Sequence, residues 1–170
     1  MSVTRLTQTS YVVLGLIERL EPATPYDLKR AAEAGVQNFW ALPHTQLYSE
    51  CARLAEAGLL AEKREEGGRR RRIYRITSAG RTELEAWRDD LDVGQWELRD
   101  HGLLKLFFGA DPAPLARVQV EAHEGRLAEY ERLRDELPGL TPGMRLALES
   151  GIGHEREYVR FWRRLADRES

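Results

Sequence analysis

Hydrophobic residues recur with helical spacing in two early segments of the chain, residues 11–20 and residues 44–57. Between them, Thr24 followed by Pro25 is typical of a helix start, because threonine accepts hydrogen bonds from exposed amides and proline suits the first turn. This middle helix is predicted to end at Gly35. The pattern predicts three short helices, and the inward stripe of the third consists of Leu47, Cys51, Leu54 and Ala55.

The pattern changes after Gly58, which is a typical residue for a helix end. Residues 59–65 and residues 72–76 are predicted to be short strands, the second being rich in β-branched and aromatic residues. Glu66-Gly-Gly-Arg69 between them is typical of a turn. Two short helices with a tight connection, followed by a β-hairpin, form the winged helix-turn-helix arrangement. We therefore assign residues 1–80 to such a domain.

The second half of the chain carries helical patterns almost throughout. Long amphipathic helices outside a small domain usually need a partner surface, and a second copy of the chain is the simplest one. The fold class is therefore predicted as mainly α, with one small β-hairpin and a helical dimerisation region over residues 81–170. No membrane span is expected, because no apolar run approaches the required length. The predicted helices are a fourth one opening at residues 77–80, then 96–108, 115–137 and 144–168.

Charge and cysteine content narrow the class of protein. The chain has 170 residues, a net charge of −2 and one cysteine, Cys51, which excludes a disulfide framework within the chain and a cysteine-rich zinc site. A reducing, cytoplasmic location is expected, with Cys51 as a buried structural thiol rather than a redox sensor. Residues 1–80 contain 12 Lys/Arg and 9 Asp/Glu, and five of those cations lie between Arg69 and Arg75. This local basic patch says more about function than the overall charge.

Features of an enzyme or a metalloprotein are missing from the sequence pattern. The four histidines are scattered, and they do not share a metal-ligand spacing on one helical face. No nucleophile motif and no glycine-rich phosphate loop is visible. We therefore predict no catalytic residue, no metal site and no cofactor. A small enzyme with a His/Asp site assembled by the fold stays as an alternative.

Eleven short segments, taken in their order and spacing, resemble the PadR family of bacterial transcriptional regulators, in the branch with a separate helical C-terminal domain. The chain departs from the family at Pro25, where a glycine is frequent, and at Arg70, where a proline is frequent. The segments are Tyr11-Val-Val-Leu-Gly-Leu, Tyr26-Asp-Leu, Phe39-Trp, His44-Thr-Gln-Leu-Tyr, Arg53-Leu-Ala-Glu-Ala-Gly-Leu, Gly68-Arg, Tyr74-Arg-Ile-Thr with Ala79-Gly, Leu98-Arg-Asp, Leu103-Leu-Lys-Leu-Phe-Phe and Leu148-Glu-Ser-Gly-Ile.

The resemblance implies a homodimer that binds a pseudo-palindromic operator in double-stranded DNA and represses a nearby promoter. It also implies a response to a small molecule, often an aromatic one. Three alternatives remain open from the residues alone. They are a winged-helix module that binds proteins and not DNA, another dimeric winged-helix family such as the MarR-like regulators, and the small enzyme described above.

Candidate DNA-binding residues lie on three elements. Glutamine pairs with adenine, arginine pairs with guanine or a phosphate, and arginines on a wing suit a narrow minor groove. Arg53 has Glu50 or Glu56 as alternative partners, Tyr48 has packing as an alternative role, and the arginine run has a solvated hairpin tip as its alternative. The predicted DNA-binding residues are Tyr26, Lys29, Thr45, Gln46, Tyr48, Ser49, Arg53, Gly68, Arg69, Arg70, Arg71 and Arg72.

Aromatic side chains supply the candidates for an effector pocket, because aromatic walls bind flat ligands well. Packing in the core or at the dimer interface is the alternative role for each of them. The candidates for binding a small aromatic effector are Trp87, Trp96, Phe107 and Trp162.

Overall fold

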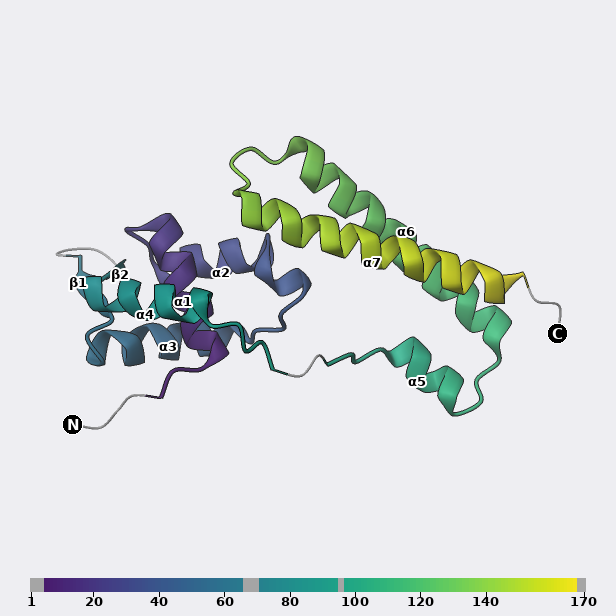
Figure 1. The fold of residues 1–170 in the computed structure, drawn as a ribbon, viewed down its shortest axis with the longest axis horizontal. Helices are drawn as coiled ribbons and strands as arrows, with labels where there is room; N and C mark the ends of the chain where they lie inside the picture. Colours follow the sequence, from purple (N-terminus) through teal and green to yellow (C-terminus); the bar gives the residue numbers. More distant parts are fainter. Residues whose placement is uncertain (1–4, 66–70, 95–96, 168–170) are drawn as a thin grey trace. The chain divides into compact units, whose positions relative to one another are not determined.

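The computed structural model describes residues 5–65, 71–94 and 97–167, and the chain divides into two compact units, Met1–Gln95 and Trp96–Ser170 (Figure 1). The first unit has the predicted order of three helices, a hairpin and a further helix, which confirms the winged helix-turn-helix fold. A short 3-10 helix that the sequence pattern did not predict joins the second and third helices. The elements are α1 (Gln8–Leu20), α2 (Pro25–Glu33), η1 (Val36–Asn38), α3 (His44–Glu56), β1 (Leu60–Arg64), β2 (Arg72–Ile76) and α4 (Ser78–Asp89).

One apolar core holds the helices of the first unit together. The predicted inward stripe of α3 is confirmed, since Leu47, Cys51 and Leu54 are fully buried. They pack in the same core as Leu14 of α1 and Leu28 of α2, which are also fully buried. Burial raises the pKa of the Cys51 thiol to about 12. The thiol therefore stays protonated and unreactive at neutral pH.

Side-chain caps set the starts of the helices around this core. At α2, the Thr24 hydroxyl accepts a hydrogen bond from the Asp27 amide at 3.3 Å, and the Asp27 carboxylate accepts one from the Thr24 amide at 2.9 Å. At α4, the Thr77 hydroxyl accepts a hydrogen bond from the Gly80 amide at 3.0 Å. Helix α4 lies against α1, where the Trp87 and Tyr11 rings stack with centroids 4.9 Å apart. The caps therefore set where α2 and α4 begin, and the ring stack joins α4 to α1.

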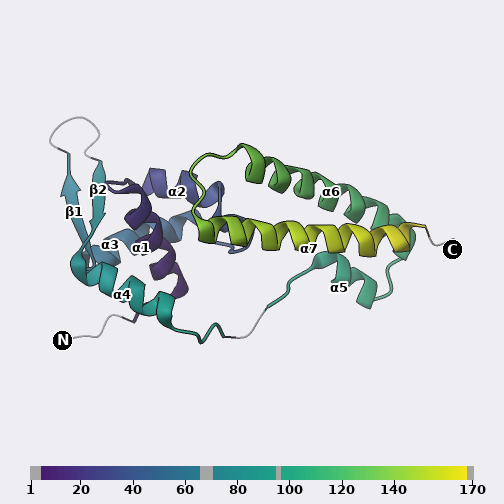
Figure 2. The same cartoon turned by 45° about the horizontal axis from the view of Figure 1, so that its top comes forward.

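The β-hairpin extends from this body, with β1 and β2 side by side and antiparallel (Figure 2). In its register Leu60 lies opposite Ile76, and both side chains are buried. Tyr74 is also buried, and its backbone exchanges two hydrogen bonds with Ala23 between α1 and α2, at 2.8 and 3.1 Å. The base of the hairpin is therefore anchored to the helical body.

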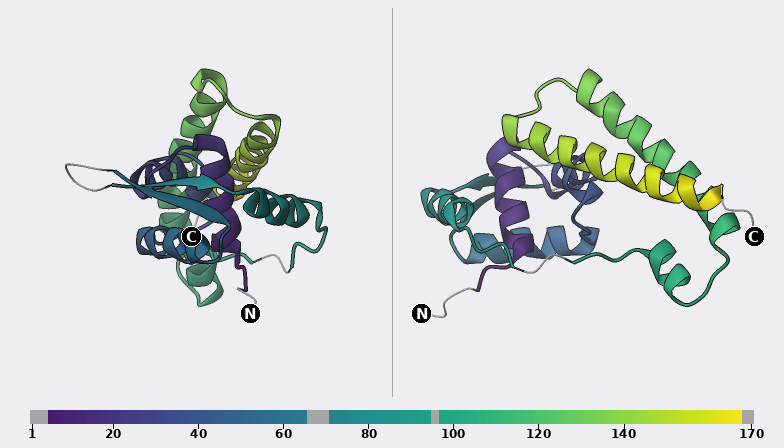
Figure 3. Two further views of the ribbon diagram at one scale, coloured as in Figure 1. Left: turned by 90° about the vertical axis from the view of Figure 1, so that its left-hand side faces the viewer. Right: turned by 45° about the vertical axis from the view of Figure 1, so that its right-hand side comes forward.

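The second unit is entirely helical in its described part, with α6 and α7 lying antiparallel and side by side (Figure 3). Gly151 of α7 contacts the ring of Tyr130 in α6, and a Cβ at this position would lie 3.0 Å from that ring. The absence of a side chain at Gly151 therefore allows the two helices to pack closely. The elements of this unit are α5 (His101–Phe107), α6 (Pro112–Glu136) and α7 (Pro142–Ala166).

All three helix starts in this unit differ from the prediction, and α7 differs least, because it begins at Pro142 instead of residue 144. A helix over 96–108 was wrong at its start, because α5 begins at His101, where the Asp100 carboxylate accepts a hydrogen bond from the Leu103 amide at 2.8 Å. The predicted helix over 115–137 was also wrong at its start, because α6 already begins at Pro112 after the Asp111 cap. Proline lacks an amide hydrogen and is well suited to a first turn. Among the described residues, no helix is both long and apolar enough to cross a membrane.

Candidate nucleic-acid interface

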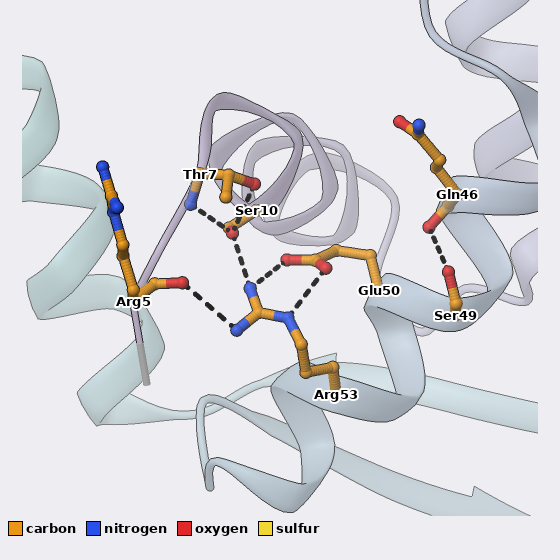
Figure 4. A network of polar contacts seen from close by, with 7 residues as sticks. All are labelled: Arg5, Thr7, Ser10, Gln46, Ser49, Glu50 and Arg53. Carbon is orange, nitrogen blue, oxygen red and sulfur yellow. Dashed lines mark hydrogen bonds and ion pairs between the residues drawn. The ribbon is translucent and has the colours of Figure 1, made fainter. Parts of the chain in front are cut away.

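The outer face of α3 is polar and accessible to a ligand. Thr45, Gln46, Tyr48 and Ser49 are exposed, while Leu47 between them is fully buried. The Ser49 hydroxyl donates to the backbone oxygens of Thr45 and Gln46, both at 3.2 Å. Within the described part of the chain, no hydrogen bond engages the Gln46 side-chain amide, which points away from the neighbouring polar cluster (Figure 4). Gln46 therefore presents both a donor and an acceptor to a ligand.

Arg53, in contrast, is bound within the protein (Figure 4). Its guanidinium donates to both oxygens of the Glu50 carboxylate, at 2.9 and 2.5 Å. It also donates to the Ser10 hydroxyl oxygen at 2.9 Å and to the Arg5 backbone oxygen at 3.3 Å. These contacts fasten α3 to the start of α1. The sequence left Glu50 and Glu56 as alternative partners of Arg53, and in the structure Arg53 pairs with Glu50.

The Glu50 carboxylate in this cluster is held in its charged form. Burial alone favours the neutral acid, but hydrogen bonds from Arg53 and Ser10 outweigh it, so the pKa of Glu50 lies below its usual value. Ser10 is fully buried and also accepts a hydrogen bond from the Thr7 amide at 2.7 Å. The cluster therefore joins a charged pair on α3 to the cap of α1.

We expect Arg53→Ala to lower the free energy of unfolding by about 1–2 kcal/mol at neutral pH, because it leaves the half-buried Glu50 without its charged partner. Urea unfolding followed by circular dichroism measures this loss. A carboxyl group with a lowered folded-state pKa contributes stability above its ordinary pKa and loses it as the pH falls. The difference between the wild type and Glu50→Gln should therefore disappear on acidification below about pH 4.

Arg75→Ala is the matched control for this prediction, because Arg75 is exposed on β2. Its loss should change the free energy of unfolding by no more than about 0.5 kcal/mol. An Arg53→Ala variant as stable as the Arg75→Ala control would contradict the structural role of Arg53.

Helix α2 and the described end of the hairpin both carry positively charged side chains next to the start of α2 or β2. Hydrogen bonds with Thr24 are the main cause of the lowered pKa of Asp27, and the charges of Arg30 and Arg71 lower it further. The charge of Arg71, which precedes β2, therefore acts on the start of α2. Arg71, Arg72 and the predicted contact Tyr26 are all exposed.

The remaining predicted DNA contacts are Lys29 and three residues of the predicted hairpin tip. Lys29 on α2 forms an ion pair with Glu33, with 3.7 Å between nitrogen and oxygen. Because both side chains are substantially exposed, this pair is weak and can exchange with a phosphate. Gly68, Arg69 and Arg70 lie outside the described residues.

Comparison with known proteins identifies the family. Residues 13–86 match the family described as Transcriptional regulator PadR-like family, and residues 98–168 match the one described as Virulence activator alpha C-term. Over residues 13–86 the chain carries the domain of the PadR-like family of transcriptional regulators. As a carrier of this domain it is a DNA-binding regulator and not an enzyme.

Individual relatives of this PadR-like protein agree with the match. The Negative transcriptional regulator PadR of Bacillus subtilis (strain 168) is 24% identical over 165 residues, which cover 88% of this chain and 90% of the relative. Bacillus subtilis PadR in complex with operator DNA has a TM-score of 0.81 at 22% identity, with 92% of this chain and 96% of that chain covered. The same protein with p-coumaric acid has a TM-score of 0.75 at 19% identity, covering 95% and 97%. The structural likenesses show that the fold is shared.

The candidate effector residues of this PadR-like regulator are found in different environments. Trp87 lies on α4 in the first unit, whereas Phe107 and Trp162 belong to the second unit, and Trp96 lies outside the described residues. Phe107 is 82% exposed and Trp162 is fully buried. Among the described residues, the Trp162 indole nitrogen is buried without a hydrogen-bond partner.

Of the three described candidates, only Trp87 lines an apolar groove of about 350 Å³ in the first unit. The sequence analysis did not assign the other aromatic residues of this groove to an effector site, although Phe39-Trp40 is one of the segments that resemble the PadR family. Within the described part of the chain, no three His, Cys, Asp or Glu side chains gather as a metal site. The aromatic residues around the groove are Tyr11, Phe39, Trp40 and Trp87.

Proposed function

We propose that this PadR-like regulator binds a pseudo-palindromic operator as a homodimer and represses transcription from the adjacent promoter in the cytoplasm. The observation that carries the proposal is the exposed polar face of α3, with Gln46 free of hydrogen bonds in the described part of the chain. In a dimer, two α3 helices would enter major grooves about 34 Å apart, one DNA turn. The hairpin arginines would contact the adjacent backbone or minor groove. The negative regulation named for the Bacillus subtilis relative supports repression.

Division of labour between the two regions is part of the proposal. The winged helix-turn-helix region, residues 1–80, would bind DNA, and the helical region, residues 81–170, would form the dimer. Large apolar side chains remain exposed on the second unit, which supports a partner surface there. A second copy of the chain would bury them in the same way on both protomers. The exposed side chains among the described residues of this unit are Leu98, Leu104, Phe107, Phe108, Val118, Leu137 and Leu146.

A small aromatic molecule would lower the affinity for the operator. The support is the p-coumaric acid bound to the Bacillus subtilis protein and the aromatic groove of the first unit. An effector acts only through a difference in affinity between two states of the protein. The ligand would therefore favour a dimer whose α3 helices no longer match the spacing of the operator.

Mobility shift with the DNA upstream of the gene and with pooled genomic fragments tests this function, at two salt concentrations and against competitor DNA. We expect selective, salt-sensitive binding by the wild type and its loss in the Arg69, Arg70, Arg71, Arg72→Ala variant. Selective binding that survives in this variant would contradict the contacts of the hairpin. A failure to bind any fragment would contradict the function. A control with the same change in net charge replaces exposed arginines of α6 and α7, namely Arg117, Arg126, Arg145 and Arg164.

A further inference from the structure

The inner face of the hairpin changes from apolar to charged along its length. At the base, Leu60 and Ile76 are buried opposite each other, and the next pair on the same face is Glu62 and Tyr74. Because side chains alternate between the two faces of a strand, the following pair on this face is Arg64 and Arg72. Both arginines are exposed, so they lie beyond the edge of the core.

Glu62 connects the buried tyrosine to the two arginines. The Tyr74 hydroxyl donates to Glu62 Oε2 at 3.1 Å, and Arg64 Nε donates to Glu62 Oε1 at 3.0 Å. Arg72 Nη1 lies 3.6 Å from Glu62 Oε2. The hydrogen bond from Arg64 is the main cause of a lowered pKa of Glu62, which is therefore ionised at neutral pH. The Glu62 side chain is only 21% exposed, so it faces the two arginines from the core side.

Tyr74 is itself immobile, because its backbone is paired with Ala23 and its ring is buried. The fixed hydroxyl orients Glu62, and Glu62 orients the two guanidiniums. Arg64 uses only its Nε for the bond to Glu62. Among the described residues, no hydrogen bond engages its two terminal nitrogens. These nitrogens remain available to an anion at the surface.

The charges around Glu62 are not balanced. Like charges directly opposite each other destabilise a strand pair, and a single carboxylate compensates only one of the two arginines. Side chains directly opposite on an antiparallel pair have Cβ atoms about 5 Å apart, so both guanidiniums can reach the same small anion. A phosphate diester supplies the missing negative charge and two non-bridging oxygens, which guanidinium groups bind in a bidentate manner.

We propose that Arg64 and Arg72 bind one phosphate of the DNA backbone between them, and that Glu62 is the positioning residue of this clamp. The proposal rests on the DNA-binding function proposed above and adds Arg64 and Glu62 to its site. It gives the outermost strand pair of the hairpin, Arg64 and Arg72, a role separate from that of the other predicted arginines at the tip. Because the phosphate backbone carries no sequence information, the clamp sets affinity and register on the DNA rather than base preference.

The salt dependence of operator binding tests the clamp, because each neutralised phosphate contributes about 0.9 to the slope of log K against log salt. The full-length wild type is compared with Arg64→Ala, Arg72→Ala and the double variant by fluorescence anisotropy on a labelled operator. We expect each single variant to lose about tenfold in affinity and the double variant to lower the slope by about 1. A slope that falls by about 2, as expected for two separate phosphates, would overturn the clamp. A slope that does not change would also overturn it.

Lys63→Ala and Arg75→Ala are matched controls, since these cations lie on the other face of the same two strands and are exposed. They should keep the wild-type slope and affinity. If the wild type binds no DNA selectively, the proposed function itself fails. If the wild type binds selectively and the double variant keeps its slope, only the clamp fails.

The role of Glu62 has a test of its own. Glu62→Gln leaves both arginines in place but removes the carboxylate that orients them. We therefore expect about threefold weaker operator binding with an unchanged salt slope. In the Arg64→Ala, Arg72→Ala background the same substitution should have no further effect. Tighter binding by Glu62→Gln would mean that the carboxylate only repels DNA, and a loss that persists without the arginines would mean a purely structural role. Either outcome would overturn the positioning role.

Discussion

Gln46→Ala is expected to weaken binding to the operator by about 5- to 150-fold, while binding to competitor DNA stays the same. A glutamine that pairs with the adenine edge contributes about 1–3 kcal/mol of discrimination between bases. Gln46 is exposed on α3, and within the described residues its amide has no competing hydrogen bond to break. Anisotropy titrations on operator and competitor DNA measure the two affinities separately.

Two further variants make this prediction specific. Gln8→Ala removes another exposed glutamine, at the start of α1, and should leave both affinities unchanged. Ser49→Ala should cost less than Gln46→Ala, because the Ser49 hydroxyl already donates to carbonyl oxygens of its own helix. If Gln46→Ala weakens both DNAs equally, the residue contacts the backbone and not a base. If it weakens neither, α3 does not present Gln46 to DNA.

Hydrophobic spacing predicted the first unit well because its helices are short, amphipathic and bounded by residues with strong local preferences. Thr24 and Gly58 act within one turn of the chain, through a cap and a positive φ of 76°, and local sequence carries that information. In α5 the apolar pattern extended the predicted helix back to Trp96. The start at His101 depends on the Asp100 cap, which apolar spacing does not record.

The outward residues of α3 could be predicted for the same reason, since burying Leu47, Cys51 and Leu54 exposes the opposite face. The role of Arg53 could not be predicted in this way. Its partners Ser10 and Arg5 are 43 and 48 residues away in the sequence, so only the packing of α1 on α3 brings them together. Arg64 and Glu62 were missed because their significance depends on strand register, which places Arg64 opposite Arg72.

Gly80→Ala is expected to be strongly destabilising, by about 3 kcal/mol or more, although it adds a single methyl group. A Cβ on Gly80 would lie 2.2 Å from the Leu59 backbone oxygen and 2.9 Å from Cγ1 of Ile76. The Leu59 oxygen cannot simply move away, because it accepts hydrogen bonds from the Thr77 amide at 3.1 Å and from the Thr77 hydroxyl at 3.0 Å. The substitution therefore separates the start of α4 from the base of the hairpin.

Gly15→Ala is the control, because it makes the same chemical change within α1 where no atom lies within 4 Å of the new Cβ. Removing a glycine from a helix interior should stabilise the protein by up to about 1 kcal/mol. Urea unfolding followed by circular dichroism should therefore give a lower free energy of unfolding for Gly80→Ala and a higher one for Gly15→Ala. Equal stabilities for Gly80→Ala and Gly15→Ala would mean that the junction of β1, β2 and α4 is looser than the structure has it. A rigid junction is what keeps Arg64 and Arg72 at a fixed position relative to α3, so Gly80→Ala should also weaken binding to the operator.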